Sequence, residues 1–375
     1  MKTVLVTGAA GFLGRHMVES LRRQPTVRVL EYDLGTTDAD FEAALAHADA
    51  IVHLAGVNRP KDPAEFKSGN TDLTADICRR VRAAGRQPTI ILSSSIQAAL
   101  ANPYGESKRG AESVLETWAR EGGGRAIIFR LKNVFGKGCR PNYNSVSATF
   151  CHNIAHGLPI TISDETKELE LVYVDDVVAA LTAAALEPAG APGAEHREVA
   201  ESYQITLGEL AAAIRRFKES RHTLVMPSFE AEFTRRLYAT YLSYLEGADF
   251  AYSLEQRHDA RGSLAEFVKS AHFGQIFVSR TNPGVTRGNH YHHTKTEKFL
   301  VVEGEAIVRF RPIWGGAEVA HRVTGRDFRV VDIPPGYAHS IENVGPGELV
   351  TIFWASEIFD PTRPDTIAAP VIRPA

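Results

Sequence analysis

Three kinds of feature are scarce in this 375-residue chain, and each absence narrows what the protein can be. The three cysteines, Cys78, Cys139 and Cys151, form no C-x-x-C pair, so neither a disulfide framework nor a thiolate zinc site is indicated. No apolar run approaches the roughly 18 residues that a membrane-spanning helix needs. The formal net charge of −3 gives no general attraction to nucleic acid or anionic lipid. We therefore expect a cytoplasmic protein with a small-molecule substrate and with no nucleic-acid or membrane partner.

The order of the apolar segments indicates two domains, 1–245 and 246–375. In the first, short apolar runs alternate with helix-length segments, which is typical of parallel strands joined by crossover helices. In the second, closely spaced strand-like segments without helices between them indicate a small β-barrel or jelly roll. The expected strands of the first domain are 4–7, 27–32, 50–54, 89–93 and 126–130, and its expected helices include 13–23, 73–84, 107–120, 207–220 and 228–245, with a surface loop over 187–193.

A glycine pattern, G-x-x-G-x-x-G, follows the first expected strand directly and consists of Gly8, Gly11 and Gly14. Glycine lets the backbone turn sharply and approach a pyrophosphate, whose charge is met by free N–H groups at a helix N-terminus. Its place between a strand and a helix predicts a Rossmann-like, doubly wound α/β sheet that binds NAD(P).

The choice between the two dinucleotides rests on charges near the second strand. Asp33 ends that strand, where a carboxylate suits the ribose 2′-hydroxyl of NAD. Arg15 or Arg28 could instead neutralise the 2′-phosphate of NADP. The residues themselves leave NADPH and NADH open.

A second motif, Tyr104 with Lys108, follows an expected strand that ends in Ser93, Ser94 and Ser95. Residues four apart on a helix share one face. An ammonium group beside a tyrosine favours the phenolate and lowers its pKa from the reference of about 10, so that it can exchange a proton near neutral pH. A serine hydroxyl would hold a substrate carbonyl while hydride arrives from nicotinamide. The pattern indicates a carbonyl reductase.

With these motifs, residues 1–245 resemble the extended short-chain dehydrogenases/reductases that act on nucleotide sugars. The segments His53-Leu54-Ala55-Gly56 and Arg130 to Gly136 add to the resemblance. It implies that Ser95 is the catalytic hydroxyl, with Ser94 second, and that Arg130 and Asn133 contact the sugar nucleotide. The residues that it assigns to the cofactor are Gly8, Gly11, Phe12, Leu13, Gly14, Asp33, His53, Ala55, Tyr104 and Lys108.

The second domain carries two motifs, Gly284-x5-His290-x-His292-x4-Glu297-x6-Gly304 and Pro334-x-Gly336-x2-His339-x3-Asn343. They resemble the two motifs of the cupins, all-β barrels that often hold a metal. His290 and His292 lie two apart, so on a strand both point into the barrel, whereas His293 points away. Glu297 follows and His339 comes from a distant strand. Three imidazoles and one carboxylate suit one divalent metal among zinc, iron, manganese and nickel, of which we expect zinc. The alternative is a metal-free barrel in which these histidines only pack.

The two halves in this order resemble the CapF/WbjC family of bifunctional enzymes of bacterial capsule and O-antigen assembly. The resemblance implies C3 epimerisation of a UDP-2-acetamido-2,6-dideoxy-4-hexulose in the cupin. Reduction of the C4 ketone with NADPH would then give the L-talose product, on the route to UDP-N-acetyl-L-fucosamine. It also implies a homodimer. His293, Lys298 and Tyr337 are candidates for the base that epimerisation needs.

Three other functions stay open. The cupin could be an inert, zinc-stapled dimerisation or regulatory module on a simple reductase. The first domain could keep its cofactor bound and catalyse a redox-neutral epimerisation or dehydration. A sugar-nucleotide sensor without catalysis would leave Ser95, Tyr104 and Lys108 without a reason to occur together.

Overall fold

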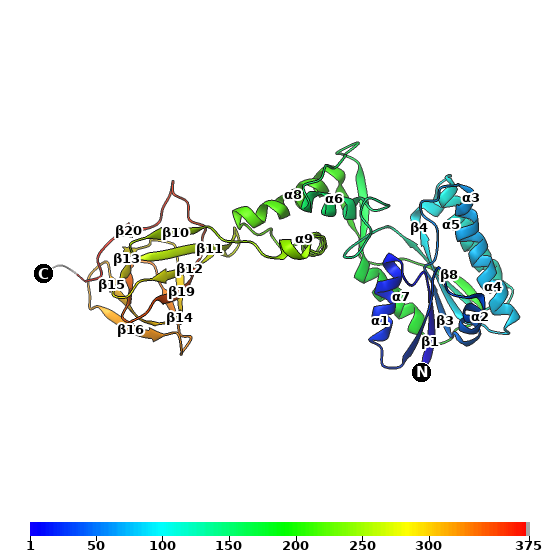
Figure 1. Ribbon diagram of the computed structural model, residues 1–375, viewed down its shortest axis with the longest axis horizontal. Helices are drawn as coiled ribbons and strands as arrows, with labels where there is room; N and C mark the ends of the chain where they lie inside the picture. Colours follow the sequence, from blue (N-terminus) through cyan, green and yellow to red (C-terminus); the bar gives the residue numbers. More distant parts are fainter. Residues whose placement is uncertain (373–375) are drawn as a thin grey trace. The chain divides into compact units, whose positions relative to one another are not determined.

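The computed structural model describes residues 1–372, and the chain forms two compact units (Figure 1). The first comprises Met1–Arg215 and Arg235–Leu245, and the second comprises Arg216–Thr234 and Glu246–Ala375. The sequence predicted one boundary near residue 245, with Arg216–Thr234 in the first domain. In the structure this segment belongs to the second unit, here called the β-unit.

The first unit is built on a six-stranded sheet of order β2-β1-β3-β4-β5-β8, in which every neighbouring pair is parallel. The same unit also contains a smaller sheet of order β6-β7-β9. The elements down to α9 are β1 (Lys2–Thr7), α1 (Phe12–Arg22), β2 (Val27–Tyr32), α2 (Asp38–His47), β3 (Ala50–His53), α3 (Ala64–Phe66), the π-helical turn η1 (Lys67–Asp72), α4 (Leu73–Ala83), β4 (Thr89–Ser95), η2 (Ile96–Ala99), α5 (Pro103–Arg120), β5 (Arg125–Leu131), β6 (Asn133–Phe135), α6 (Val146–Ala155), β7 (Glu168–Tyr173), α7 (Val174–Leu186), β8 (Gly193–Arg197), β9 (Tyr203–Thr206), α8 (Leu207–Thr223) and α9 (Glu232–Leu242).

Helices cover both faces of the six-stranded sheet. On β1, Val4 and Val6 face the cluster that contains α1 and α7, whereas Leu5 faces the cluster that contains α2, α4 and α5. Figure 1 shows these two helix layers on opposite sides of the strands. The doubly wound, Rossmann-like fold is thus confirmed. In the described part of the chain, no helix has the length and hydropathy needed to cross a bilayer.

Two local differences from the sequence prediction concern the sheet and its main helix. Helix α5 begins at Pro103 rather than at residue 107, because Asn102 caps it by accepting the N–H of Gly105 at 2.8 Å and proline fits the first turn. The loop expected over 187–193 ends where β8 begins at Gly193 and adds the sixth strand.

The β-unit consists of two antiparallel sheets, one of order β10-β11-β12-β19-β14-β17 and one of order β16-β15-β18-β13-β20. Their inner faces share one apolar core, in which Phe299, Val301 and Phe353 meet Val308 and Ile341. The all-β barrel or jelly-roll prediction is confirmed. Its elements are η3 (Gly247–Phe250), β10 (Gln256–Asp259), β11 (Gly262–Ser270), β12 (Gly274–Thr281), β13 (Thr286–Tyr291), β14 (Glu297–Glu303), β15 (Glu305–Pro312), β16 (Val319–Thr324), β17 (Val330–Ile333), β18 (Tyr337–Asn343), β19 (Leu349–Ala355) and β20 (Ile367–Ala368).

Candidate functional site

A cleft of about 800 Å³ opens at the carboxyl ends of the parallel strands in the first unit. This edge is where open α/β sheets bind ligands. The predicted site residues that line it are Gly8, Gly11, Phe12, Leu13, Gly14, Asp33, Ala55, Ser95, Tyr104, Lys108 and Asn133. The two predicted residues of this unit that do not line it are His53 and Arg130.

The glycine-rich turn joins β1 to α1, and two of its glycines are required by close packing. Gly8 has φ +70°, and a Cβ there would lie 2.7 Å from the backbone nitrogen of Ala55. A Cβ on Gly14 would lie 1.9 Å from the Gly8 carbonyl oxygen. Gly11 precedes α1 and has no side chain to cap it, so the first N–H groups of the helix face the cleft uncapped. An anion is what such an N-terminus binds.

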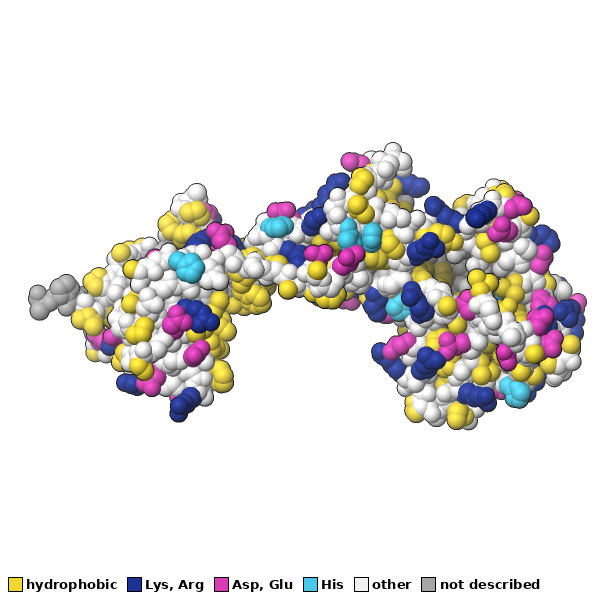
Figure 2. Space-filling view, viewed as in Figure 1, with side chains coloured by type: hydrophobic (Ala, Val, Ile, Leu, Met, Phe, Trp, Pro, Cys, Tyr) yellow, Lys and Arg dark blue, Asp and Glu magenta, His cyan; other side chains and the backbone are white. Residues whose placement is uncertain are grey.

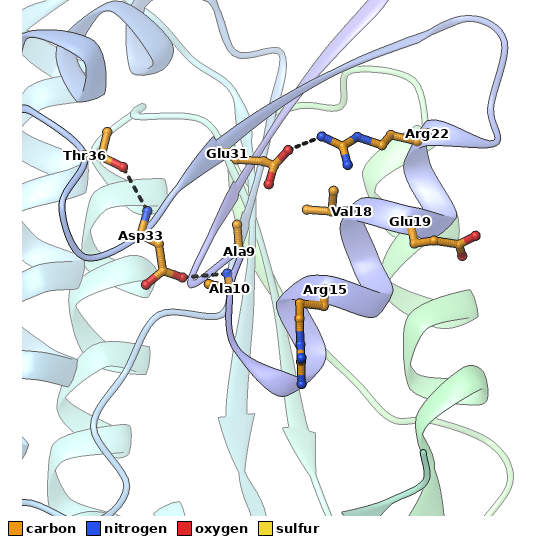
Figure 3. A pocket seen from close by; sticks show the side chains of 9 residues that line it. All are labelled: Ala9, Ala10, Arg15, Val18, Glu19, Arg22, Glu31, Asp33 and Thr36. Atoms are coloured by element: carbon orange, nitrogen blue, oxygen red, sulfur yellow. Dashed lines mark hydrogen bonds and ion pairs between the residues drawn. The ribbon is translucent and has the colours of Figure 1, made fainter. Parts of the chain in front are cut away.

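Asp33 lies at the far end of this turn, where Figure 3 shows a smaller pocket. One carboxylate oxygen accepts the N–H of Ala10 at 2.7 Å, and the other accepts the N–H of Leu34 at 2.7 Å. Arg15, in the first turn of α1, lines both the pocket and the cleft, whereas Arg28 lines neither. Of these two arginines, only Arg15 lies at this end of the cleft, and its Nη2 donates to the Gly138 carbonyl at 2.9 Å.

Ser95, Tyr104 and Lys108 meet at one side of the cleft, the serine from the end of β4 and the other two from α5. The Tyr104 hydroxyl hydrogen-bonds to Ser95. Lys108 Nζ lies 5.9 Å from the centroid of the Tyr104 ring and donates to the Ser93 carbonyl at 2.9 Å. Ser94, the second serine considered, donates its hydroxyl to Glu112 at 2.5 Å. The geometry thus favours Ser95 as the hydroxyl available to a carbonyl substrate.

Burial tunes the acidity of both helix residues. It raises the pKa of Tyr104, an effect that the Ser95 hydrogen bond opposes. Burial also lowers the pKa of Lys108 to about 8, against the opposing charge of Glu112. Lys108 therefore stays mostly protonated at neutral pH. The sequence predicted that Lys108 would lower the pKa of Tyr104, but burial raises it instead, so Tyr104 keeps its proton at neutral pH.

Glu112 is a functional candidate that the sequence reasoning missed. It lies one turn beyond Lys108 on α5, with its side chain 3% exposed. Arg130 donates two hydrogen bonds to it, from Nε to Oε1 at 2.9 Å and from Nη2 to Oε2 at 2.7 Å. The predicted substrate contact of Arg130 is not what this geometry supports, because its guanidinium is committed to Glu112 outside the cleft. The signal in the sequence was an acid four residues after the lysine.

His53 holds strands and helices together behind the cleft. Its imidazole is 1% exposed and lies between two hydroxyls, with Nδ1 2.7 Å from Thr7 Oγ1 and Nε2 3.0 Å from Thr74 Oγ1. Burial lowers the pKa of His53 to about 3, so the ring is neutral. Its side chain reaches the cleft only through Thr7, whose hydroxyl also accepts the N–H of Ala55, a residue that lines the cleft, at 3.2 Å.

Asn70, which the sequence reasoning also missed, joins α5, the helix of Tyr104 and Lys108, to the loop that follows β3. It is 2% exposed within the π-helical turn η1. Its amide nitrogen donates to Ser107 Oγ at 2.9 Å and to the Val57 carbonyl at 3.0 Å, and its oxygen accepts the Val57 N–H at 2.9 Å. A π-helical turn often marks a functional site. Here it places the Asn70 amide between Ser107 of α5 and Val57 in the loop after β3.

The four predicted metal ligands of the β-unit converge. His290 lies near the end of β13 and His292 directly after it, Glu297 begins β14 and His339 lies on β18. One ligand atom from each residue lies within 4.8 Å of all the others. Burial and the neighbouring imidazoles lower the pKa of His290 to about 4, which leaves it neutral and able to coordinate.

Unpaired nitrogen atoms indicate that this cluster suits a cation. Nε2 of His292 and Nε2 of His339 are buried without a hydrogen-bond partner, 3.3 and 3.4 Å from Glu297 Oε2. Burial disfavours the charge of Glu297, but its contacts with these two histidines outweigh that effect and hold its pKa below the usual range. Buried imidazole nitrogens whose lone pairs have no partner, beside one buried carboxylate, are what a divalent ion would satisfy.

The three candidate bases occupy different surroundings. Lys298 points outward and pairs with Asp332, and His293 is exposed. Tyr337 lies two residues before His339 on β18 and packs partly buried against the core, on the same side of the strand. The sequence reasoning missed Lys295, which is 8% exposed and has Nζ 3.8 Å from Glu297 Oε1.

Comparison with known proteins covers the whole chain. Residues 4–200 match the NAD dependent epimerase/dehydratase family, and residues 257–367 match the polysaccharide biosynthesis C-terminal domain. A UDP-2-acetamido-2,6-beta-L-arabino-hexul-4-ose reductase of Pseudomonas aeruginosa is 44% identical over 98% of this chain and 98% of its own length. The capsular polysaccharide assembling protein CapF of Staphylococcus aureus has a crystal structure that aligns with a TM-score of 0.90 at 44% identity, over 98% of this chain and 100% of that chain. UDP-glucose 4-epimerase of Thermus thermophilus, 20% identical, aligns with a TM-score of 0.52 over 64% of this chain and 98% of its own, and shares the fold alone.

Proposed function

This chain belongs to the NAD-dependent epimerase/dehydratase family, and from that premise we propose a bifunctional enzyme acting on a UDP-activated 4-keto deoxy sugar. The β-unit epimerises C3 of a UDP-2-acetamido-2,6-dideoxy-4-hexulose. The first unit reduces the C4 ketone with NADPH to UDP-2-acetamido-2,6-dideoxy-L-talose, on the route to UDP-N-acetyl-L-fucosamine in capsule or O-antigen assembly. One observation carries the reductase assignment: Ser95, Tyr104 and Lys108 share a cleft with the glycine-rich turn, in a chain whose 44% identical relative is named a 4-ulose reductase.

The reductase step follows from the placement of three side chains. When bound, NADPH supplies the hydride that adds to C4. The Ser95 hydroxyl donates a hydrogen bond to the ketone oxygen, and the Tyr104 hydroxyl delivers the proton that turns this oxygen into an alcohol. Lys108 holds a positive charge beside the resulting phenolate. Positioned acid catalysis of this kind contributes about 10²–10⁴-fold to a rate.

The preference for NADPH rests on Arg15. Both oxygens of Asp33 already accept backbone N–H groups, which offsets part of its repulsion of a 2′-phosphate. Arg15 lines the same pocket and would supply the opposite charge by exchanging its hydrogen bond to the Gly138 carbonyl for one to the phosphate. NADH remains a second, weaker cofactor in this proposal, because Asp33 can still accept a ribose hydroxyl.

The epimerase step would belong to the barrel interior. The C4 ketone acidifies the proton at C3, so its removal gives an enolate that can be protonated from the other face. Zinc held by His290, His292, Glu297 and His339 would supply Lewis acidity at that centre. Of the candidate bases, Tyr337 is the first to test, because it shares the interior side of β18 with a ligand.

A structural metal is the second candidate for the β-unit, and one observation favours it. Four protein donors surround the proposed ion. Four protein ligands are typical of structural zinc, whereas catalytic zinc usually keeps one position open. The protein would then reduce the unepimerised ketone.

Incubation of the purified protein with a UDP-2-acetamido-2,6-dideoxy-4-hexulose in deuterated water, with and without NADPH, separates these functions. The proposal requires deuterium at C3 without NADPH and NADPH oxidation with it. Oxidation without C3 exchange would leave the metal structural. Exchange at C3 that persists in a His290→Ala variant would place epimerisation outside the cluster.

The homodimer is proposed to form through the outer face of the larger β-sheet. Val278, Ile352, Leu300 and Val330 lie opposite one another across β12, β19, β14 and β17. Ile352 and Val330 are 38% and 52% exposed. Figure 2 shows hydrophobic side chains gathered on the side of the β-unit where these strands run. A row this apolar fits a second copy of itself, and sedimentation of an Ile352→Glu variant as a monomer would support that arrangement, whereas an unchanged dimer would contradict it.

A further inference from the structure

Residues 365–371, near the end of the described chain, run beside the histidine cluster, and we name this segment the C-terminal strap. Its short strand β20 pairs with the end of β13, with His290 opposite Ala368 and Tyr291 opposite Ile367. The N–H of Ala369 donates to the carbonyl of Asn289 at 2.8 Å. One ligand-bearing strand is thus held from its outer edge by the strap.

A second ligand, His292, is oriented by the strap directly. Its Nδ1 hydrogen-bonds to the backbone carbonyl of Asp365. A carbonyl oxygen only accepts, so Nδ1 carries the proton and Nε2 keeps its lone pair. That lone pair belongs to the buried Nε2 that has no hydrogen-bond partner near Glu297. The strap therefore selects the tautomer that can coordinate.

The carboxylate of Asp365 fixes the loop between two ligands. It accepts the N–H groups of His293, Thr294 and Lys295 at 2.8, 2.7 and 2.8 Å, and the Thr294 hydroxyl at 3.0 Å. Four donors on one carboxylate hold three consecutive residues in a single conformation. This loop connects His292 to Glu297, so its geometry sets the distance between them.

The third ligand, Glu297, is reached through Lys295. Lys295 Nζ donates to Thr366 Oγ1 of the strap at 3.1 Å and lies 3.8 Å from Glu297 Oε1. Glu297 Oε2 faces the histidines. The strap thereby places a positive charge behind the carboxylate oxygen that does not face the cluster.

Arg311 fastens the far end of the strap to the barrel. Its Nε donates to the Val371 carbonyl at 2.9 Å, and its Nη2 donates to the Pro370 carbonyl at 2.7 Å. The strap is thus anchored on β15 independently of the cluster, so it can serve as a fixed frame for the ligands.

We infer that the C-terminal strap is the positioning element of the metal centre, with Asp365 as its central residue and Thr366 as its second. This inference rests on the proposed metal site. Asp365 and Thr366 touch neither metal nor substrate; they act through His292, Glu297 and the loop between them. Loss of such supporting contacts typically weakens metal binding by about 10–100-fold.

Zinc affinity of the full-length protein tests the inference without reference to turnover. Metal-free protein is titrated with Zn²⁺ against a chromophoric chelator, for the native sequence and for Asp365→Ala, Asp365→Asn and Thr366→Ala. We expect the dissociation constant to rise about 10–100-fold in Asp365→Ala and less in the other two, because an amide oxygen still accepts and only one contact is lost with the threonine. Asp360→Ala is the matched control, since Asp360 bonds locally to Thr362 and to no cluster residue in the described chain.

A second measurement reads the tautomer. In the ¹⁵N spectrum of the metal-free protein, His292 should carry its proton on Nδ1. Asp365→Ala keeps the backbone carbonyl that accepts this proton but removes the side-chain hydrogen bonds that hold the carbonyl in place, so it should give a mixture of both tautomers. Circular dichroism of the metal-free variants shows whether the barrel is folded. If the Asp365→Ala variant is unfolded, the zinc affinity of Thr366→Ala tests the role of the strap instead. Equal zinc affinities of the native, Asp365→Ala and Thr366→Ala proteins would overturn the role of the strap alone. A native protein that binds no zinc would overturn the metal site as well.

Discussion

The two candidate sites differ in how their polar atoms are satisfied. In the first unit, Ser95 bonds to Tyr104, Lys108 bonds to the Ser93 carbonyl and Glu112 is bound by Arg130. In the β-unit, Nε2 of two buried histidines has no hydrogen-bond partner. A buried unsatisfied polar atom costs roughly 1–3 kcal/mol, so a bound cation would stabilise the second site, whereas Ser95, Lys108 and Glu112 of the first site already have protein partners.

The same difference appears in where the side chains come from. The reductase residues lie on the end of one strand and the first turns of one helix, close together in the chain. The metal ligands come from three strands, and the strap that supports them comes from the C-terminal end. The first site therefore depends on local structure, and the second depends on the closure of the whole barrel.

The largest effect that would sharpen this comparison is expected for Tyr104→Phe. Removing the proton donor should reduce NADPH oxidation by about 10²–10⁴-fold. Zinc content and C3 deuteration should be unchanged, because the two sites share no residue. NADPH consumption and mass spectrometry of the sugar measure the two outcomes. A parallel loss of C3 exchange would show that the sites are coupled.

Removal of a metal ligand should abolish zinc binding by the β-unit and leave ketone reduction by the first unit intact. In His290→Ala we expect zinc affinity to fall by more than about 100-fold, beyond what loss of an outer contact costs. Thermal unfolding of the β-unit should also lose its dependence on added zinc, since binding no longer stabilises the folded state. Reduction of an already epimerised ketone should be retained. Its disappearance would contradict independent sites.

A smaller effect concerns the cofactor end of the cleft. Arg15→Ala should raise KM for NADPH by about tenfold, as expected for one partly exposed charge-assisted contact to phosphate, and should leave KM for NADH nearly unchanged. Arg28→Ala is the matched control, because that side chain lines neither pocket. Equal KM changes for both cofactors would remove Arg15 from the 2′-phosphate.

The smallest effect is a shift in pH dependence. Burial lowers the pKa of Lys108 to about 8, although the nearby Glu112 carboxylate opposes this shift. In Glu112→Gln the pKa of Lys108 should fall further, so the alkaline loss of kcat/KM, where the ammonium group deprotonates, should move to lower pH. Comparison of rate profiles between about pH 6 and pH 9 measures the shift. An unchanged alkaline limb would reduce Glu112 to a structural role.

Much of the fold was predictable because its signals are local. Both ends of the strand over 27–32 and the start of the helix at Leu73 were predicted correctly. The spacing of apolar residues and the flanking residues fix these positions. The first residue of α5 was missed because Asn102 and Pro103 form the cap, a signal weaker than the apolar pattern that starts later. Strand β8 was missed because its sequence, Gly-Ala-Glu-His-Arg, contains no large apolar side chain.

The sites divide along the same line. Sequence alone determined the glycine turn and the pair Tyr104 and Lys108, because motif spacing on one strand or helix constrains direction. The set of three imidazoles and one carboxylate came from the resemblance to the cupin motifs, and the structure brings these four side chains together. Only the tertiary structure decided that Arg130 binds Glu112 instead of lining the cleft, that Ser94 is committed elsewhere, and that residues 365–371 hold the cluster. Those contacts join segments far apart in the chain, and which segments meet is set by packing of the whole unit, which no local pattern encodes.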